Sequence, residues 1–98
     1  MSLPLVFRAA AQAEFDEAAA WYEERQAGLG ADFVDEVQRV LDIITDQSLR
    51  YPIVSGDVRE ASCCRFPFCL YYRVKGDRVV VISVFHTSRD PEIWQSRS

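Results

Sequence analysis

A tight turn between two apolar runs constrains the fold of this chain more than any other feature of its sequence. Lys75-Gly76-Asp77-Arg78 separates the runs at 68–74 and 79–85, which are rich in β-branched and aromatic residues. Gly76 can adopt the positive φ that a two-residue hairpin turn needs at its first central position. We therefore predict a tight antiparallel hairpin whose loop is Gly76 and Asp77.

The two-residue loop also predicts the cross-strand pairs, which follow by counting back from the turn. Lys75 lies opposite Arg78, and one face carries the pairs Val74–Val79, Tyr72–Val81, Leu70–Ser83 and Phe68–Phe85. Because side chains alternate along a strand, the other face carries Arg73 opposite Val80, Tyr71 opposite Ile82, Cys69 opposite Val84, and Pro67 near His86.

This second face is too apolar for a sheet face that is open to solvent. Its apolar members are Tyr71, Val80, Ile82 and Val84. Two alternatives remain for what packs on this face. It could be a C-terminal segment of this chain, or it could be a partner protein, since large exposed apolar patches mark interaction sites.

Two amphipathic helices are predicted upstream of the hairpin. A short strand at 3–8 comes first, and Pro4 restricts it to a sheet edge or a strand start. The first helix begins at Ala9, and its apolar face is formed by Ala11, Phe15, Ala18 and Tyr22. The second has the apolar stripe Leu29, Phe33, Val37, Val40, Leu41 and Ile44, with Asp35, Glu36, Gln38, Arg39, Asp42 and Asp46 pointing to water. Their short glycine-containing connection makes them an antiparallel helical hairpin that buries its stripe on the sheet.

The remaining segments complete one domain over residues 1–98. Pro52 ends the second helical region, a turn follows at 55–57, and a strand is predicted at 58–66 before a corner at Pro67. The predicted class is α+β, with the order β-α-α-β-β-β and a small antiparallel sheet packed against the helical hairpin.

Composition excludes several classes of protein. The net charge of −4 argues against a general nucleic-acid binder, so no direct sequence-specific binding of nucleic acid is expected. No apolar run approaches a membrane span and no signal-peptide pattern is present, which favours a cytoplasmic protein. The three cysteines, Cys63, Cys64 and Cys69, fit small buried hydrophobes better than a disulfide or zinc site, and no cofactor or metal is expected.

Motifs spread over nearly the whole chain carry a family resemblance. They are Ala18 to Tyr22, Phe33, Tyr51-Pro52, Val58-Arg59-Glu60, Arg65-Phe66-Pro67-Phe68, Tyr71-Tyr72-Arg73-Val74, Val84-Phe85-His86, Ser88-Arg89-Asp90-Pro91 and Trp94. With them the chain resembles toxins of the RelE/ParE superfamily of bacterial type II toxin–antitoxin systems, often labelled plasmid stabilisation proteins, and the later motifs resemble its ParE-like side. The resemblance implies a toxin that inhibits DNA gyrase by binding and is neutralised by a cognate antitoxin. The oligomeric state is left open.

The RelE-like side of the superfamily implies a different activity, ribosome-dependent cleavage of messenger RNA. Its members place an arginine where this chain has Cys69, lysines where it has Val58-Arg59-Glu60, and a Tyr or His where it has Ile93-Trp94. If the chain is nevertheless a ribonuclease, the candidate catalytic residues are Arg59, Arg65, Arg73, His86 and Arg89. An inactive toxin homologue is a third reading.

Each candidate residue also has a structural reading. His86 fits a strand-end histidine bonded to backbone, and Arg59 and Arg65 fit ion pairs with the acidic helices or with an acidic antitoxin segment. The predicted antitoxin-binding residues are Tyr71, Val80, Ile82 and Val84. The predicted target-binding residues are His86, Arg89 and Trp94, although Asp90 and Pro91 fit equally well a turn that anchors the Trp94 tail.

Overall fold

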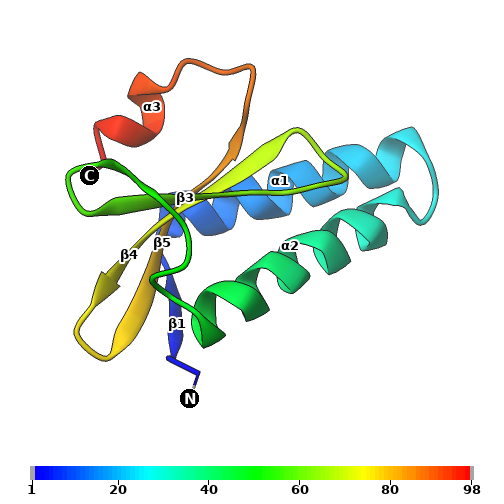
Figure 1. Cartoon of the computed structure of the whole chain (residues 1–98). Helices are drawn as coiled ribbons and strands as arrows, with labels where there is room; N and C mark the ends of the chain where they lie inside the picture. The colour runs from blue at the N-terminus through cyan, green and yellow to red at the C-terminus, as the bar shows by residue number, and fades with distance from the viewer. Residues whose placement is uncertain (1, 98) are drawn as a thin grey trace.

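The computed structural model describes residues 2–97, which form one mixed sheet with two long helices on one face and a short helix on the other (Figure 1). The elements are β1 (Leu5–Phe7), α1 (Ala9–Arg25), α2 (Leu29–Asp46), β2 (Ile53–Ser55), β3 (Val58–Ser62), β4 (Phe68–Lys75), β5 (Arg78–His86) and α3 (Glu92–Gln95). The predicted α+β class, with a helical hairpin packed against the sheet, is confirmed.

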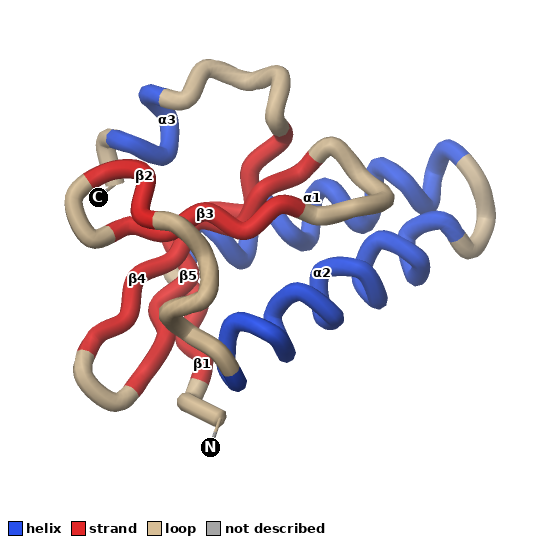
Figure 2. Tube along the Cα trace, viewed as in Figure 1, coloured by secondary structure: helices blue, strands red, loops and turns tan. Residues whose placement is uncertain are grey.

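The sheet has five strands in the order β1-β5-β4-β3-β2 (Figure 2). Its neighbours are antiparallel except β1 and β5, which run parallel, so the expectation of an antiparallel sheet is wrong for this one pair. β2 and α3 are additional to the predicted order. The strand expected at 58–66 ends at Ser62, and residues 63–67 form the corner that leads into β4.

The connection between α1 and α2 is fixed by a carboxylate and a close backbone approach. The Glu23 carboxylate accepts hydrogen bonds from the backbone N–H groups of Gly28 and Gly30, at 2.9 and 3.0 Å. These amides lie at the start of α2, where helix N–H groups have no partner within the helix. A Cβ on Gly30 would lie 2.7 Å from the carbonyl oxygen of Ala19, so only glycine lets the two helices approach this closely.

The β4–β5 hairpin has the predicted turn but a different register beyond its middle. Gly76 has a φ of +59°, and the pairs from Lys75–Arg78 to Tyr72–Val81 are those expected. Tyr71 then pairs with Ser83, so Ile82 is an extra residue on β5, which is a β-bulge. The later pairs are Leu70–Val84, Cys69–Phe85 and Phe68–His86, and the predicted pairs beyond Val81 are therefore wrong.

The bulge moves three side chains to the face opposite the one expected. Val84 packs in the core between the sheet and the long helices, whereas Phe85 packs in the cluster on the other side. His86 lies beside Phe68, with ring centroids 5.1 Å apart, and so it also faces the long helices. His86 and Arg73, expected on one face, are therefore on opposite faces of the sheet.

The larger core lies between the sheet and the α1–α2 pair. Phe33 of α2 is fully buried at its centre, with the rings of Phe15, Tyr22, Phe66 and Phe68 between 5.0 and 5.9 Å away. The predicted apolar stripes of both helices belong to this core or pack against it. The sequence periodicity therefore placed the helices in the correct rotation.

Glu36, expected to point to water, is instead only 5% exposed. Its carboxylate accepts two hydrogen bonds from the Arg39 guanidinium, at 3.0 and 3.1 Å, and one from the backbone N–H of Cys64 at 2.7 Å. The Arg39 hydrogen bond lowers the pKa of Glu36 to about 2 despite the opposing effect of burial. The expectation was wrong because a neighbouring arginine and a loop amide make burial of this charge favourable.

A second, smaller core lies on the other face of the sheet, under α3. Trp94 stacks on Tyr71 with ring centroids 3.9 Å apart and an interplanar angle of 13°, and it is 3% exposed. Ile82 and Phe85 belong to the same cluster. Of the two covers left open by the sequence, the C-terminal segment of this chain is the one present. Among the described residues, no helix has both the length and the apolar character needed to cross a membrane.

Candidate functional site

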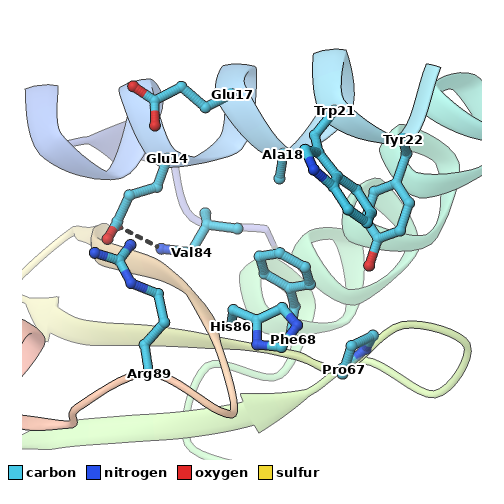
Figure 3. A pocket seen from close by; sticks show the side chains of 10 residues that line it. All are labelled: Glu14, Glu17, Ala18, Trp21, Tyr22, Pro67, Phe68, Val84, His86 and Arg89. Carbon is cyan, nitrogen blue, oxygen red and sulfur yellow. Dashed lines mark hydrogen bonds between the residues drawn. The ribbon is translucent and has the colours of Figure 1, made fainter. Parts of the chain in front are cut away.

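A groove lies between α1, the start of β4 and the end of β5 (Figure 3). Its volume is about 480 Å³. We call it the α1–β5 groove, and it is lined by Glu14, Glu17, Ala18, Trp21, Tyr22, Pro67, Phe68, Val84, His86 and Arg89. Helical spacing explains one wall, since Glu14, Ala18 and Trp21 recur every three or four residues and so share a face of α1.

The middle of the groove is apolar and aromatic. Ala18 and Trp21 come from α1, and Phe68 and Val84 come from the strands. Val84 faces the groove because the bulge at Ile82 turns it toward the long helices. The indole of Trp21 is 50% exposed, and the guanidinium carbon of Arg25 lies 4.4 Å from its ring centroid. A large aromatic side chain that stays half-exposed beside an apolar groove is typical of a binding surface.

His86 stands at the end of β5 with one ring nitrogen already occupied. The backbone N–H of Ser88 donates to Nδ1 at 3.1 Å, and the Ser88 hydroxyl lies 2.7 Å from the same atom. An amide N–H can only donate, so Nδ1 is the acceptor and the proton of the neutral ring is on Nε2. This contact agrees with the structural interpretation of His86 as a strand-end histidine bonded to backbone. It leaves Nε2 as a hydrogen-bond donor.

Glu14 belongs to the groove wall, but its carboxylate is used within the chain. It accepts hydrogen bonds from the Ser83 hydroxyl at 2.8 Å, the Val84 N–H at 3.2 Å and the Arg97 guanidinium at 2.9 and 3.2 Å. This carboxylate therefore joins α1 to the bulged part of β5 and to the C-terminal tail. Glu17 points away from the groove in Figure 3, and the basic side chains that line it are His86 and Arg89.

The five candidate ribonuclease residues are not brought together. Arg59 donates to the backbone carbonyls of Leu49 and Tyr51, at 3.2 and 2.6 Å, and so fixes the segment after α2. Two further arginines form ion pairs, Arg65 of the corner before β4 with Asp32 at 3.9 Å and Arg73 of β4 with Asp57 at 3.3 Å. Only His86 and Arg89 share one site, the α1–β5 groove. The predicted pairing of an arginine with an acidic helix is confirmed for Arg65, whereas Arg59 binds carbonyls instead.

The four predicted antitoxin-binding residues are all buried within the chain, which contradicts the premise that they form an open face. Tyr71 and Ile82 lie under α3, Val84 lies in the core on the other side, and Val80 is 9% exposed. The Tyr71 hydroxyl donates to the Glu60 carboxylate at 2.7 Å, and burial, followed by this hydrogen bond, raises the pKa of Tyr71. Antitoxin binding at Tyr71 or Ile82 stays a prediction, and it requires α3 to move.

The predicted target-binding residues are also divided between the two sides of the sheet. His86 and Arg89 line the α1–β5 groove, whereas Trp94 is buried against Tyr71 under α3. Asp90 has the anchoring role considered for it, because its carboxylate accepts the backbone N–H of Glu92 at the start of α3 at 3.0 Å. Three groove residues were not singled out from the sequence: Glu14, Glu17 and Trp21. The two glutamates resemble the charged residues of any solvated helix face. Trp21 lies beside the predicted apolar stripe of the first helix.

The cysteines behave as packing residues where they are buried. Cys63 and Cys69 are buried and Cys64 is exposed, and all three are free thiols. Burial raises the pKa of the Cys63 thiol to about 12, which keeps it protonated and unreactive at neutral pH. Within residues 2–97 no group of three or more His, Cys, Asp or Glu side chains is placed to hold a metal ion.

Comparisons with known proteins match both the sequence and the fold. The family model described as the ParE toxin of the type II toxin-antitoxin system, parDE, matches residues 5–91. No curated protein matches the chain. A solved structure titled "Chromosomal ParDE TA system from P. aeruginosa" has a TM-score of 0.75 and 18% sequence identity, covering 89% of this chain and 98% of that one. At this identity the structural likeness shows the fold, while the family model identifies the family.

Proposed function

The chain belongs to the ParE toxin family of type II toxin–antitoxin systems, and from this premise we propose that it inhibits DNA gyrase by binding and is neutralised by a cognate antitoxin. Its place of action is then the cytoplasm, where bacterial DNA and its topoisomerases are. The family itself implies the antitoxin partner; gyrase as the target is our proposal.

The dispersal of the candidate nuclease side chains is the observation that carries this proposal. Cleavage of RNA by 2′-hydroxyl attack needs a general base, a general acid and cations that converge on one phosphate. Here Arg59 holds backbone carbonyls, Arg65 and Arg73 are in separate ion pairs, and only His86 and Arg89 share a groove. Inhibition by binding needs a complementary surface and no such convergence, so this arrangement favours it.

Ribosome-dependent cleavage of messenger RNA is the second candidate, and one observation speaks for it. His86 and Arg89 line the same groove, and a histidine can act as a general acid or base while an arginine can bind phosphate. The Ser88 amide, however, occupies Nδ1, and both predicted partners Arg59 and Arg73 are bound elsewhere. Of the other proton-transfer groups that line the groove, Glu14 is bound by Ser83, Val84 and Arg97, and Tyr22 has a pKa raised by burial. Glu17 points away from the groove (Figure 3).

Induction of the chain without antitoxin, in cells that carry a DNA-damage reporter and a translation reporter, separates the candidates. We expect growth arrest with induction of the DNA-damage reporter, while primer extension on translated messages shows no new ends. Codon-linked cuts that disappear in a His86→Ala or Arg65→Ala variant would favour the ribonuclease instead. Normal growth with soluble, folded protein would identify an inactive homologue.

A further inference from the structure

We propose that the outer edge of β2 is a self-association surface, at which two copies of this chain pair antiparallel about a two-fold axis beside Ile53. β2 stands at one end of the strand order, and among the described residues no strand lies on its outer side (Figure 2). The pairing would join the sheets of the two copies into one. It goes beyond the proposed function, because none of the residues that line the α1–β5 groove lies in this part of the chain.

Apolar side chains gather at this edge. The large apolar side chains that lie exposed in residues 2–97 are few, and three of them lie in the segment 49–54. Leu49 is 67% exposed, Ile53 is 53% exposed and Val54 is 43% exposed. Single exposed apolar residues are ordinary on protein surfaces, whereas a cluster of them marks an interaction surface.

The backbone of Ile53 points to the outer side of the edge. Ile53 lies opposite Arg59, and the Glu60 N–H donates to the Pro52 carbonyl at 3.1 Å. Along a strand the N–H and C=O of one residue point to one side, and those of the next residue point to the other. Since Pro52 faces β3, the N–H and C=O of Ile53 face outward. The N–H that proline lacks would also have faced β3, so Pro52 leaves the outer edge intact.

A second copy of the same strand fits these outward groups. Two antiparallel strands related by a two-fold axis can exchange a reciprocal pair of hydrogen bonds between the same residue of each copy. With Ile53 opposite Ile53 of the second copy, the two Cα atoms would be about 5.5 Å apart and the side chains would be in contact. The contact is complete with two copies, and the bulge between Ile53 and Ser55 keeps the ladder short. We therefore expect a closed dimer of modest affinity.

The charges on either side of Ile53 favour this antiparallel register. Counting outward from the axis brings positions 49 and 50 close to positions 57 and 56 of the second copy. Arg50 is exposed and belongs to none of the ion pairs among residues 2–97. The Asp57 side chain is 62% exposed beside Arg73. The axis therefore places an exposed arginine near an exposed carboxylate twice, so the chain supplies its own complementary charges.

Sedimentation velocity of the purified full-length chain over a dilution series measures this association. We expect a concentration-dependent change from one chain to two, together with slower hydrogen exchange at the Ile53 amide as the dimer forms. Ile53→Asp and Ile53→Lys should each weaken the dimer at least about tenfold, because the axis sets like charges opposite each other. The matched control is Val34→Asp, at an exposed apolar position on α2, which should change the dissociation constant by no more than about a factor of two.

A mixture of the two charged variants tests the register itself. Ile53→Asp and Ile53→Lys chains in equal amounts should associate at least about tenfold more tightly than either variant alone, because opposite charges then meet across the axis. Only a register that brings position 53 close to position 53 of the second copy predicts this recovery.

Equal thermal midpoints of the variants and wild type would show that the fold is retained. If position 53 does not tolerate a charge, Arg50→Glu provides the test without touching it and should weaken the dimer about threefold. Three results would overturn the inference. Wild type could stay monomeric up to millimolar concentration, or it could form a dimer that the charged variants leave unchanged. The Ile53 amide could also gain protection only when a different protein is added, which would assign the edge to that protein.

Discussion

At the scale of single residues, three glutamates join segments of the chain through hydrogen bonds to backbone amides. Glu23 binds the first amides of α2, Glu36 binds the Cys64 amide of the corner before β4, and Glu14 binds the Val84 amide next to the bulge. In each case a carboxylate accepts a hydrogen bond from the backbone N–H of another segment. Such charge-assisted hydrogen bonds are stronger than neutral ones. These three side chains therefore hold the backbone segments that they contact in place.

Glu36→Gln tests this role through the pH dependence of stability. The substitution should lower the free energy of unfolding by about 1–3 kcal/mol at pH 7, because the Arg39 and Cys64 contacts lose their charged acceptor. The pKa of Glu36 in the folded chain is about 2, below its ordinary value of 4.5, so its stabilisation is complete above pH 4.5 and is lost as the pH falls towards 2. Urea unfolding at several pH values should show the difference between the two proteins shrinking across that range. An equal difference at pH 7 and pH 2.5 would contradict the assignment.

Phe33→Ala tests the packing of the larger core. Phe33 is fully buried among four aromatic rings, and its truncation should cost about 3–5 kcal/mol because it leaves a cavity that these rings cannot fill. Thermal and urea unfolding of the variant measure this loss. A near-wild-type midpoint would show that the α1–α2 pair does not pack on the sheet as described, and Val34→Ala, at an exposed position on the same helix, is the control.

At the scale of elements, α3 is held in place by its contacts and not by its own helical stability. A helix of four residues is far too short to form alone. The Asp90 carboxylate accepts the N–H of Glu92 at its start, Trp94 stacks on Tyr71, and Arg97 beyond its end pairs with Glu14. Removing one of these contacts should therefore loosen the whole segment from the sheet.

Trp94→Ala should uncover Tyr71 while the larger core remains intact. Because burial is the main cause of the raised pKa of Tyr71, the variant should ionise this tyrosine at a lower pH than wild type does. Spectrophotometric titration, together with hydrogen exchange across β4, would show the opening. The matched control is Trp21→Ala, which removes a half-exposed tryptophan on the other side of the sheet and should leave the titration of Tyr71 unchanged.

The elements that could be predicted from sequence are those whose signal is local and repeated. Gly76 specified the hairpin turn, and the spacing of Phe33, Val37 and Leu41 specified the buried side of α2. The bulge at Ile82 could not be predicted, because one extra residue in an apolar run leaves composition and turn unchanged while it exchanges the faces of every later side chain.

The same limit explains what was missed at the site. Val84 and His86 enter the α1–β5 groove only because of the bulge, and Glu14 reaches β5 from 70 positions earlier in the chain. The two added elements, β2 and α3, have three and four residues, too few for a period to be read. The burial of Glu36 depends on a contact with Cys64 that lies 28 positions away, which no local pattern contains.

At the scale of the whole molecule, the two faces of the sheet are covered by different elements. The α1–α2 side holds the larger core and the open α1–β5 groove, and the α3 side is closed by Trp94. His86 and Arg89 are the predicted target contacts that lie on the open side. The proposal that this toxin acts by binding DNA gyrase therefore concerns the open side of the sheet.

Titration of the purified protein into a DNA gyrase supercoiling reaction tests that claim most directly, with relaxed plasmid, ATP and a parallel sample denatured to reveal trapped double-strand breaks. We predict dose-dependent loss of supercoiling with accumulation of linear DNA, reversal by prior addition of the antitoxin, and a weaker effect for a His86→Ala, Arg89→Glu double variant than for Arg50→Glu. Undisturbed gyrase at saturating protein, alongside cuts in a translated message in a purified translation system, would contradict the account.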